Sequence, residues 1–265
     1  NMFKKLNENN TLIKWLNIKL NNKIGKRIGF GTESVVYEYG NNKVIKLTNH
    51  KINNLNKIIN RDINGLVKIY NIGYIYPPQK FIHKDKISLS GKKLPKVTTV
   101  KSFKDYHNIS SSTIMNTNGK IGYIIMEKLN TIGVQDKFNE IELKLHNLFT
   151  ANKIVETMDE EMIQIIERNK DEDGDIDENE LQILFEMLKH NKKKTKELLK
   201  RKQIVNNFVK LLLISLENII TFFPNWNDLH SGQFGFNNNG ELIAFDFDDG
   251  LSSKVEIKYP KNIIR

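Results

Sequence analysis

Near its C-terminus the chain reads Trp226-Asn227-Asp228-Leu229-His230-Ser231-Gly232-Gln233, and after a short interval it continues Phe245-Asp246-Phe247-Asp248. The first run offers a carboxylate at Asp228 and an amide at Gln233, and the second offers a carboxylate at Asp246. Residues 242–245, which lead into Asp246, are apolar and predict a buried strand. Transfer of a phosphoryl group from ATP needs one carboxylate to orient the attacking hydroxyl. It also needs an amide oxygen and a second carboxylate to hold the metal ion.

The N-terminal part of the chain predicts a strand hairpin that begins at a glycine turn. It reads Ile28-Gly29-Phe30-Gly31-Thr32-Glu33-Ser34-Val35-Val36 and so passes from glycines into β-branched residues. Glycines let backbone N–H groups approach a phosphate closely. Residues 40–42 then predict a turn, and residues 43–47 predict the return strand, which carries Lys46. Residues 121–129 predict a further buried strand with a polar exit, as expected for a hinge between two lobes.

Together these motifs resemble the protein-kinase-like superfamily, over roughly residues 25–76, 121–130 and 205–250. The Asp-Leu-His form of the loop is closer to aminoglycoside and other small-molecule phosphotransferases than to typical protein kinases. The resemblance implies ATP and Mg²⁺ as cofactors, Asp228 and Lys46 as catalytic residues, and Gln233 and Asp246 as magnesium ligands. It implies nucleotide-binding roles for Gly29, Gly31, Ser34, Lys46, Met126, Glu127 and Leu129.

Three departures from the family pattern leave a second interpretation open. Gln233 stands where the family has asparagine, residues 47–60 contain no acid to pair with Lys46, and only nineteen residues follow Asp246. The lysine would then be oriented by Asp246 alone or by an asparagine, Asn53, Asn54 or Asn56. The alternative is a pseudokinase, which keeps the fold and the nucleotide but has lost catalysis.

A second pattern lies between the predicted hinge at residues 121–129 and the Asp-Leu-His loop that begins at Asp228. It is a twelve-residue run from Asn169 to Glu180. Glycine occupies its sixth position and isoleucine its eighth, and oxygen-bearing side chains recur where a calcium-binding loop needs them. Position 7 contributes a backbone carbonyl, so Asp175 need not bind through its side chain. The predicted calcium ligands are Asn169, Asp171, Asp173, Asp175, Asp177 and Glu180.

The flanks of this run predict two helices. Residues 157–160 predict a capping box that begins at Thr157, and apolar residues recur at helical spacing in 162–166 and 181–188. The region 157–189 therefore resembles an EF-hand. The alternative, an acidic solvated linker, would need neither the glycine nor the apolar periodicity. We expect Ile176 to form the short strand that pairs two such loops, although the sequence shows no second loop of this type.

The composition and charge of the chain indicate which kinds of partner it could bind. The chain has 265 residues, no cysteine and a formal net charge of +10. Residues 156–190 carry thirteen acids and three Lys or Arg, a net of −10, so the remainder carries +20. The basic residues gather in 80–104 and 192–202, where they could bind an anionic substrate, nucleic acid or the acidic segment. Nucleic acid is the disfavoured partner, because no aromatic residues interleave with the basic ones.

The expected cellular location follows from three features that the sequence lacks. Without cysteine the chain has no disulfide and no thiolate-bound metal, and no apolar run reaches the length of a membrane span. The N-terminal residues also lack the apolar core of a signal peptide. These features favour the cytoplasm. The composition, rich in Asn, Lys and Ile, suits an AT-rich genome such as that of a virus, in which case the cytoplasm is a host cell's.

We therefore expect an α+β protein with a two-lobed kinase-like fold, a helical EF-hand insertion and a reduced C-terminal lobe. Residues 1–129 would form the N-lobe and hinge, with a polar insertion at 77–120. Residues 130–204 would form the helical insertion, and residues 205–265 the catalytic lobe. The expected function is phosphotransfer from ATP, regulated or braced by calcium. The rival is a calcium-sensing pseudokinase that binds nucleotide and a partner. The phosphoacceptor, protein or small molecule, and the oligomeric state are not specified by the sequence.

Overall fold

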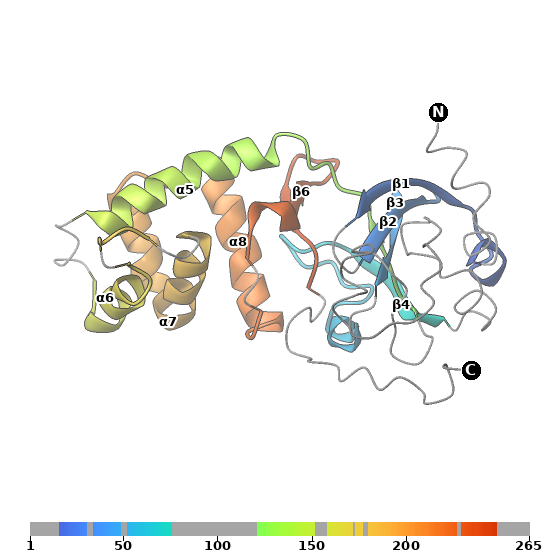
Figure 1. Ribbon diagram of the computed structural model, residues 1–265, viewed down its shortest axis with the longest axis horizontal. Helices are drawn as coiled ribbons and strands as arrows, with labels where there is room; N and C mark the ends of the chain where they lie inside the picture. Colours follow the sequence, from blue (N-terminus) through green and yellow to red (C-terminus); the bar gives the residue numbers. More distant parts are fainter. Residues whose placement is uncertain are drawn as a thin grey trace, which may run out of the picture. The chain divides into compact units, whose positions relative to one another are not determined.

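The computed structural model describes residues 16–30, 34–48, 52–75, 121–151, 158–171, 173–176, 180–226 and 229–247, which Figure 1 colours along the chain. By their internal contacts these residues form two compact units. The first comprises the described residues up to Arg61 and from Lys68 to Lys128, and the second comprises Asp62–Val67 and Leu129–Phe247. The second unit thus contains both the predicted helical insertion and the catalytic-lobe residues up to Phe247.

The first unit is built on a five-stranded antiparallel sheet in the order β1-β2-β3-β5-β4. Its strands are β1 (Ile24–Phe30), β2 (Ser34–Tyr39), β3 (Lys43–Thr48), β4 (Ile69–Ile75) and β5 (Ile121–Glu127). This sheet, followed in the chain by a helical region, confirms the predicted α+β class. The strand predicted to precede the hinge, β5, lies inside the sheet between β3 and β4.

Local sequence explains why β2 and β3 pair as they do. Buried and half-buried residues alternate along β2, as expected for a strand with one face on the core, whereas β3 is almost wholly buried because it is the central strand. The turn between them needs a left-handed backbone, with φ +65° at Gly40 and +53° at Asn42. Glycine and asparagine are the residues that adopt this conformation most readily. The turn predicted at residues 40–42 therefore sets the register of the hairpin.

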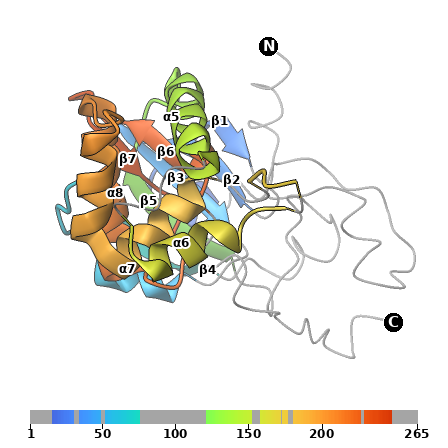
Figure 2. The ribbon, with the colours of Figure 1, turned by 90° about the vertical axis from the view of Figure 1, so that its left-hand side faces the viewer.

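The second unit is mainly helical and contains α5 (Val134–Thr150), α6 (Glu160–Glu167), α7 (Glu180–Arg201) and α8 (Asn207–Phe222). A 3-10 turn, η2 (Ser231–Gln233), leads into a hairpin of β6 (Phe234–Phe236) and β7 (Leu242–Ala244). The apolar helix α8 packs against β7 (Figure 2). No helix in the described part of the chain has the length and hydropathy that crossing a bilayer requires.

Helix α7 consists of two helices joined at a kink. Asn191 has φ −147° and ψ 85°, which is not helical. Its Oδ1 accepts a hydrogen bond from the Lys194 N–H at 3.1 Å and so caps the helix that follows. The first half of α7 therefore ends at His190, and the second half begins after the kink.

A short segment, Asp62–Val67, runs beside β7. The Val67 N–H donates to the Ala244 carbonyl and the Ala244 N–H donates to the Gly65 carbonyl, both at 2.9 Å. Gly65 has φ +78°, and a Cβ at this position would lie 2.8 Å from Cα of Ser215 on α8. Only glycine fits here without moving the helix, so this residue sets how closely α8 approaches the segment.

Candidate functional site

Lys46 lies in a row of residues that crosses the sheet of the first unit. In this row Gly29 of β1 faces Val36 of β2, which faces Lys46 of β3. Lys46 is only 4% exposed, which is rare for a lysine. Neighbouring strands lie about 4.8 Å apart, so the backbones of Gly29 and Lys46 are roughly 10 Å apart. The structure therefore brings the predicted glycine strand and the predicted phosphate-binding lysine together.

The predicted glycine loop is described at its two ends. Gly29 pairs within β1, and Ser34 opens β2 opposite Thr48 of β3. Gly31 lies outside the described residues, so its contact with phosphate stays a prediction.

The segment after β3 departs from a kinase-like pattern. It contains a short 3-10 helix, η1 (Asn53–Lys57), which buries Leu55. The sequence between Leu47 and Asn60 carries no carboxylate. The polar side chains of η1 are therefore amides and one lysine, and within this segment only an asparagine could stand in for the missing acid. That role stays a prediction.

The predicted hinge residues lie at the end of β5 and just beyond it. Met126 is 6% exposed, and the Glu127 N–H donates to the Lys68 carbonyl at 3.0 Å. Leu129 belongs to the second unit, where it packs against Gly235. A Cβ on that glycine would lie 2.7 Å from Cβ of Leu129. The three residues thus have well-defined backbone positions, while their contact with a nucleotide stays a prediction.

The two predicted magnesium ligands lie at the base of the β6–β7 hairpin. Phe234 pairs with Ala244, and one step further the Phe245 N–H donates to the Gln233 carbonyl at 2.8 Å. Asp246 follows Phe245 directly. The hairpin therefore brings Gln233 and Asp246 together, as the sequence spacing predicts.

Asp246 has a strained backbone. Its φ is +74°, a conformation that costs a non-glycine residue about 1–2 kcal/mol. Strain of this kind persists only where the surroundings fix it, and it clusters at functional sites. Here the hydrogen bond of Phe245 fixes one side, and on the other Phe247 stacks on Phe223 with ring centroids 4.8 Å apart. Between Leu229 and Phe247 the structure describes two carboxylate residues, Glu241 and Asp246, and of these only Asp246 has this conformation.

The side chain of Gln233 turns back onto its own loop. It is 3% exposed, and its Oε1 accepts a long hydrogen bond of 3.4 Å from the His230 N–H. The His230 Nδ1 in turn accepts from the Gly232 N–H at 3.1 Å, which closes a capping box over η2. Amide and carboxylate oxygens are ligands that magnesium takes, so Gln233 and Asp246 fit the ion chemically.

Trp226, which precedes Asp228 in the chain, packs against two other aromatic rings, while Asp228 itself lies outside the described residues. Trp226, two positions before it, meets Phe247 with ring centroids 5.6 Å apart. Trp226 also meets Phe185 of α7 edge-on at 6.4 Å. Aromatic pairs of this kind contribute about 0.5–1.5 kcal/mol beyond their buried area. Sequence reasoning gave these rings no role, although aromatic residues beside both acidic positions were the available signal.

The described part of the predicted calcium loop is a tight hairpin. Lys170 and Ile176 form an antiparallel bridge, and the Asp171 N–H donates to the Asp175 carbonyl at 2.9 Å. Gly174 has φ +86°, with open space where a Cβ would lie, which agrees with the sharp turn predicted there. Ile176 thus bridges Lys170 within its own loop, and its expected pairing with a second loop stays a prediction.

Those predicted calcium ligands that the structure describes do not converge on one point. Asp171 Oδ1 accepts from the N–H groups of Asp173 and Asp175 at 3.0 and 2.9 Å, while Asn169 Nδ2 donates to a carbonyl of α6 at 2.6 Å. Asp177 lies outside the described residues. Across the described ranges, no three or more His, Cys, Asp or Glu side chains form a metal-binding group. The donor set itself, carboxylates and one amide, suits calcium, so binding would require these side chains to converge.

Glu180, the last predicted calcium ligand, contacts α5. Its Oε1 lies 3.1 Å from Nδ1 of His146. Burial, and then the negative charge of Glu180, raise the pKa of Glu142, which lies one turn before His146 on α5. The Glu180 carboxylate is therefore held beside α5, and a calcium ion would compete with His146 for it.

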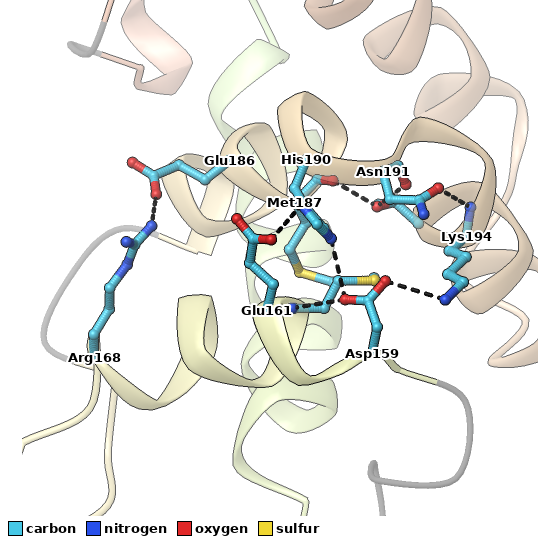
Figure 3. Close-up of polar contacts among 10 residues, drawn as sticks. Asp159, Glu161, Arg168, Glu186, Met187, His190, Asn191 and Lys194 are labelled. Atoms are coloured by element: carbon cyan, nitrogen blue, oxygen red, sulfur yellow. Dashed lines mark hydrogen bonds and ion pairs between the residues drawn. The ribbon is translucent and has the colours of Figure 1, made fainter.

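The helices on either side of the loop are joined at Asp159 (Figure 3). Its Oδ1 accepts from the Met162 N–H at 3.0 Å, which makes Asp159 the N-cap of α6 in place of the predicted Thr157. This backbone hydrogen bond, and then Lys194, lower the pKa of Asp159. His190 Nε2 lies 3.1 Å from Asp159 Oδ1, and Lys194 Nζ lies 3.1 Å from Oδ2. These two residues flank the α7 kink, so one carboxylate contacts both halves of α7.

Comparison with models of known protein families, and with curated proteins, finds no match for this chain. A functional proposal therefore rests on the two groupings described above, Gly29 with Lys46 and Gln233 with Asp246.

Proposed function

We propose that this protein is an ATP- and magnesium-dependent phosphotransferase of the kinase-like class, regulated or braced by a calcium-binding EF-hand. In this proposal Lys46 and the loop at residues 29–34 bind the phosphates, and Asp228 orients the acceptor hydroxyl. Magnesium, when bound, would neutralise phosphate charge. Its ligands would be Gln233 and Asp246, and the hinge residues bordering the nucleotide would be Met126, Glu127 and Leu129.

The strained backbone at Asp246 carries this proposal. A hairpin closed only for stability has no need of a left-handed aspartate beside a buried amide, because glycine would take that conformation without strain. The position of Lys46 gives independent support, since a kinase-like lysine is expected on the third strand of the sheet. Lys46 lies on β3 and is buried.

Nucleotide binding is the first test. With ATP and magnesium at a hundred times the dissociation constant, the wild type should gain about 2.7 kcal/mol of stability. This gain, measured as a thermal shift with and without nucleotide, should be lost in Lys46→Ala and in Asp246→Asn. The matched control is Lys43→Ala on the same strand, because side chains at odd and even positions of a strand point to opposite faces. A shift that survives both site variants would place the nucleotide elsewhere.

Calcium binding is the second test. Calorimetry should detect binding in the micromolar-to-millimolar range, as for sensor and weaker hands. Glu180→Gln should weaken it more than about tenfold, because the loss of even an outer-shell partner of a metal ligand costs ten- to a hundredfold in affinity. Glu186→Gln makes the same chemical change farther along α7 and should leave the affinity unchanged. Equal affinities for the two variants would remove Glu180 from the site.

A pseudokinase is the second candidate function, favoured by the segment after β3. That segment holds the short helix η1, and its sequence has no carboxylate to pair with Lys46. A pseudokinase would show the nucleotide-dependent thermal shift but no turnover. Measuring ATP hydrolysis and autophosphorylation, with calcium and with chelator, separates it from an active enzyme.

A further inference from the structure

The calcium loop at residues 169–180 is connected along the chain, through α7 and then α8, to the segment that carries Asp228. The sequence therefore predicts that a movement of the loop could reach that segment through these two helices. The kink at Asn191 interrupts this route, because a rotation of the first half of α7 is not passed rigidly to the second half. Asp159 also ties both halves to the start of α6, through His190 and Lys194 (Figure 3). A movement of Glu180 therefore needs another path to reach the catalytic segment.

A direct contact supplies that path. Phe185 lies on the first half of α7, about one and a half turns after Glu180, and is fully buried. Its ring meets Trp226 edge-on, with centroids 6.4 Å apart and planes at 90°. Trp226 in turn meets Phe247 at 5.6 Å, and Phe247 directly follows Asp246. Trp226 lies two positions before Asp228, and Phe247 lies directly after Asp246. These rings thus link the helix that begins at Glu180 to the segments that carry the two proposed catalytic carboxylates.

We infer that the contact of Phe185 with Trp226 transmits the occupancy of the calcium loop to the segment that carries Asp228 and Asp246. Trp226 is then a positioning residue for this segment. The inference rests on the proposed calcium site and adds the route by which that site acts. Close-packed interiors pass on a displacement because buried rings cannot shift without moving their neighbours. If Glu180 left His146 to serve as a calcium ligand, the first half of α7 would follow it, and Phe185 would shift Trp226 and Phe247.

The indole itself reports on this movement. The chain has two tryptophans, Trp15 and Trp226, so in a Trp15→Phe background the emission comes from Trp226 alone. Adding calcium to this variant should change the emission, with the same midpoint as the calorimetric binding curve. Adding Phe185→Leu should leave calcium affinity unchanged and abolish most of the emission change. Phe149→Leu removes an equally buried ring from α5 and should retain the change.

The outcomes separate the inference from the site on which it depends. If calorimetry shows no calcium binding to the wild type, the calcium site and the inference both fail. If calcium binds but Trp226 emission does not respond, or if Phe185→Leu keeps the full response, only the inference is overturned. Should Phe185→Leu unfold, Phe185→Met keeps the volume of the side chain without the ring and must give the same loss of signal.

Discussion

Changing Asp228 to asparagine should reduce phosphoryl transfer from ATP about a hundredfold or more, since a positioned general base typically contributes 10²–10⁴-fold. Asparagine keeps the size of the side chain but cannot accept the proton of the acceptor hydroxyl. ATP hydrolysis or autophosphorylation measures the loss. The nucleotide-dependent thermal shift should persist in this variant, because the proposed phosphate and magnesium contacts come from other residues.

Two comparisons make this result specific to the proposed role. Asp136→Asn is the same chemical change in the first turn of α5, and its activity should equal that of the wild type. Asp246→Asn should lose both activity and the thermal shift, so the two aspartates are distinguished by nucleotide binding. If Asp228→Asn retains full activity, the base lies elsewhere and the proposed mechanism is wrong. If the wild type binds nucleotide without turnover, the pseudokinase is favoured.

Gly65→Ala should lower the free energy of unfolding of the second unit by about 2–5 kcal/mol. Overpacking a close contact costs about 1–3 kcal/mol, and a left-handed backbone adds about 1–2 kcal/mol for a residue with a Cβ. The new methyl group would lie 2.7 Å from Ser215 Oγ and 2.8 Å from its Cα. Relief of this contact requires α8 to move away from Asp62–Val67. Urea unfolding followed by circular dichroism measures the loss.

Gly240→Ala is the matched control for this prediction. Gly240 has φ +76°, close to the value at Gly65, but nothing lies within 4 Å of the position of its missing Cβ. It should therefore show the backbone cost alone, about 1–2 kcal/mol. The difference between the two variants isolates the close approach of α8. Equal losses would mean that α8 shifts easily and that Gly65 does not set its position.

The contacts of Glu180 and Phe185 bear on whether the proposed EF-hand would regulate the protein or brace it. Glu180 contacts α5 through His146, and Phe185 on the same helix contacts Trp226. A sensor-type hand changes the angle between its helices when it binds calcium, and both contacts lie on the half of α7 that would move. A brace would bind calcium without a change in Trp226 emission.

Local chemistry determined the parts of the fold that depend on a few neighbouring residues. The turn at residues 40–42 follows from glycine and asparagine, and the strand character of β3 follows from its β-branched residues. The spacing of Gln233 and Asp246 likewise predicted their approach, because a short hairpin between them leaves few alternatives. Gly174 took the positive φ that the calcium-loop pattern predicts. In each case the deciding interactions lie within about a dozen residues of the chain.

Tertiary structure alone decided the rest, because the deciding partners are remote in sequence. The sequence around Gly65 does not show that this residue lies against Ser215. Glycine is needed at this position only once α8 packs beside β7. The cap of α6 fell on Asp159 rather than Thr157 in part because His190 and Lys194, across a kinked helix, also bind that carboxylate. From the sequence, Trp226 and Phe185 look like ordinary core residues, and only the folded structure shows that they touch. Sequence periodicity shows which residues are buried, whereas packing determines which buried residues touch.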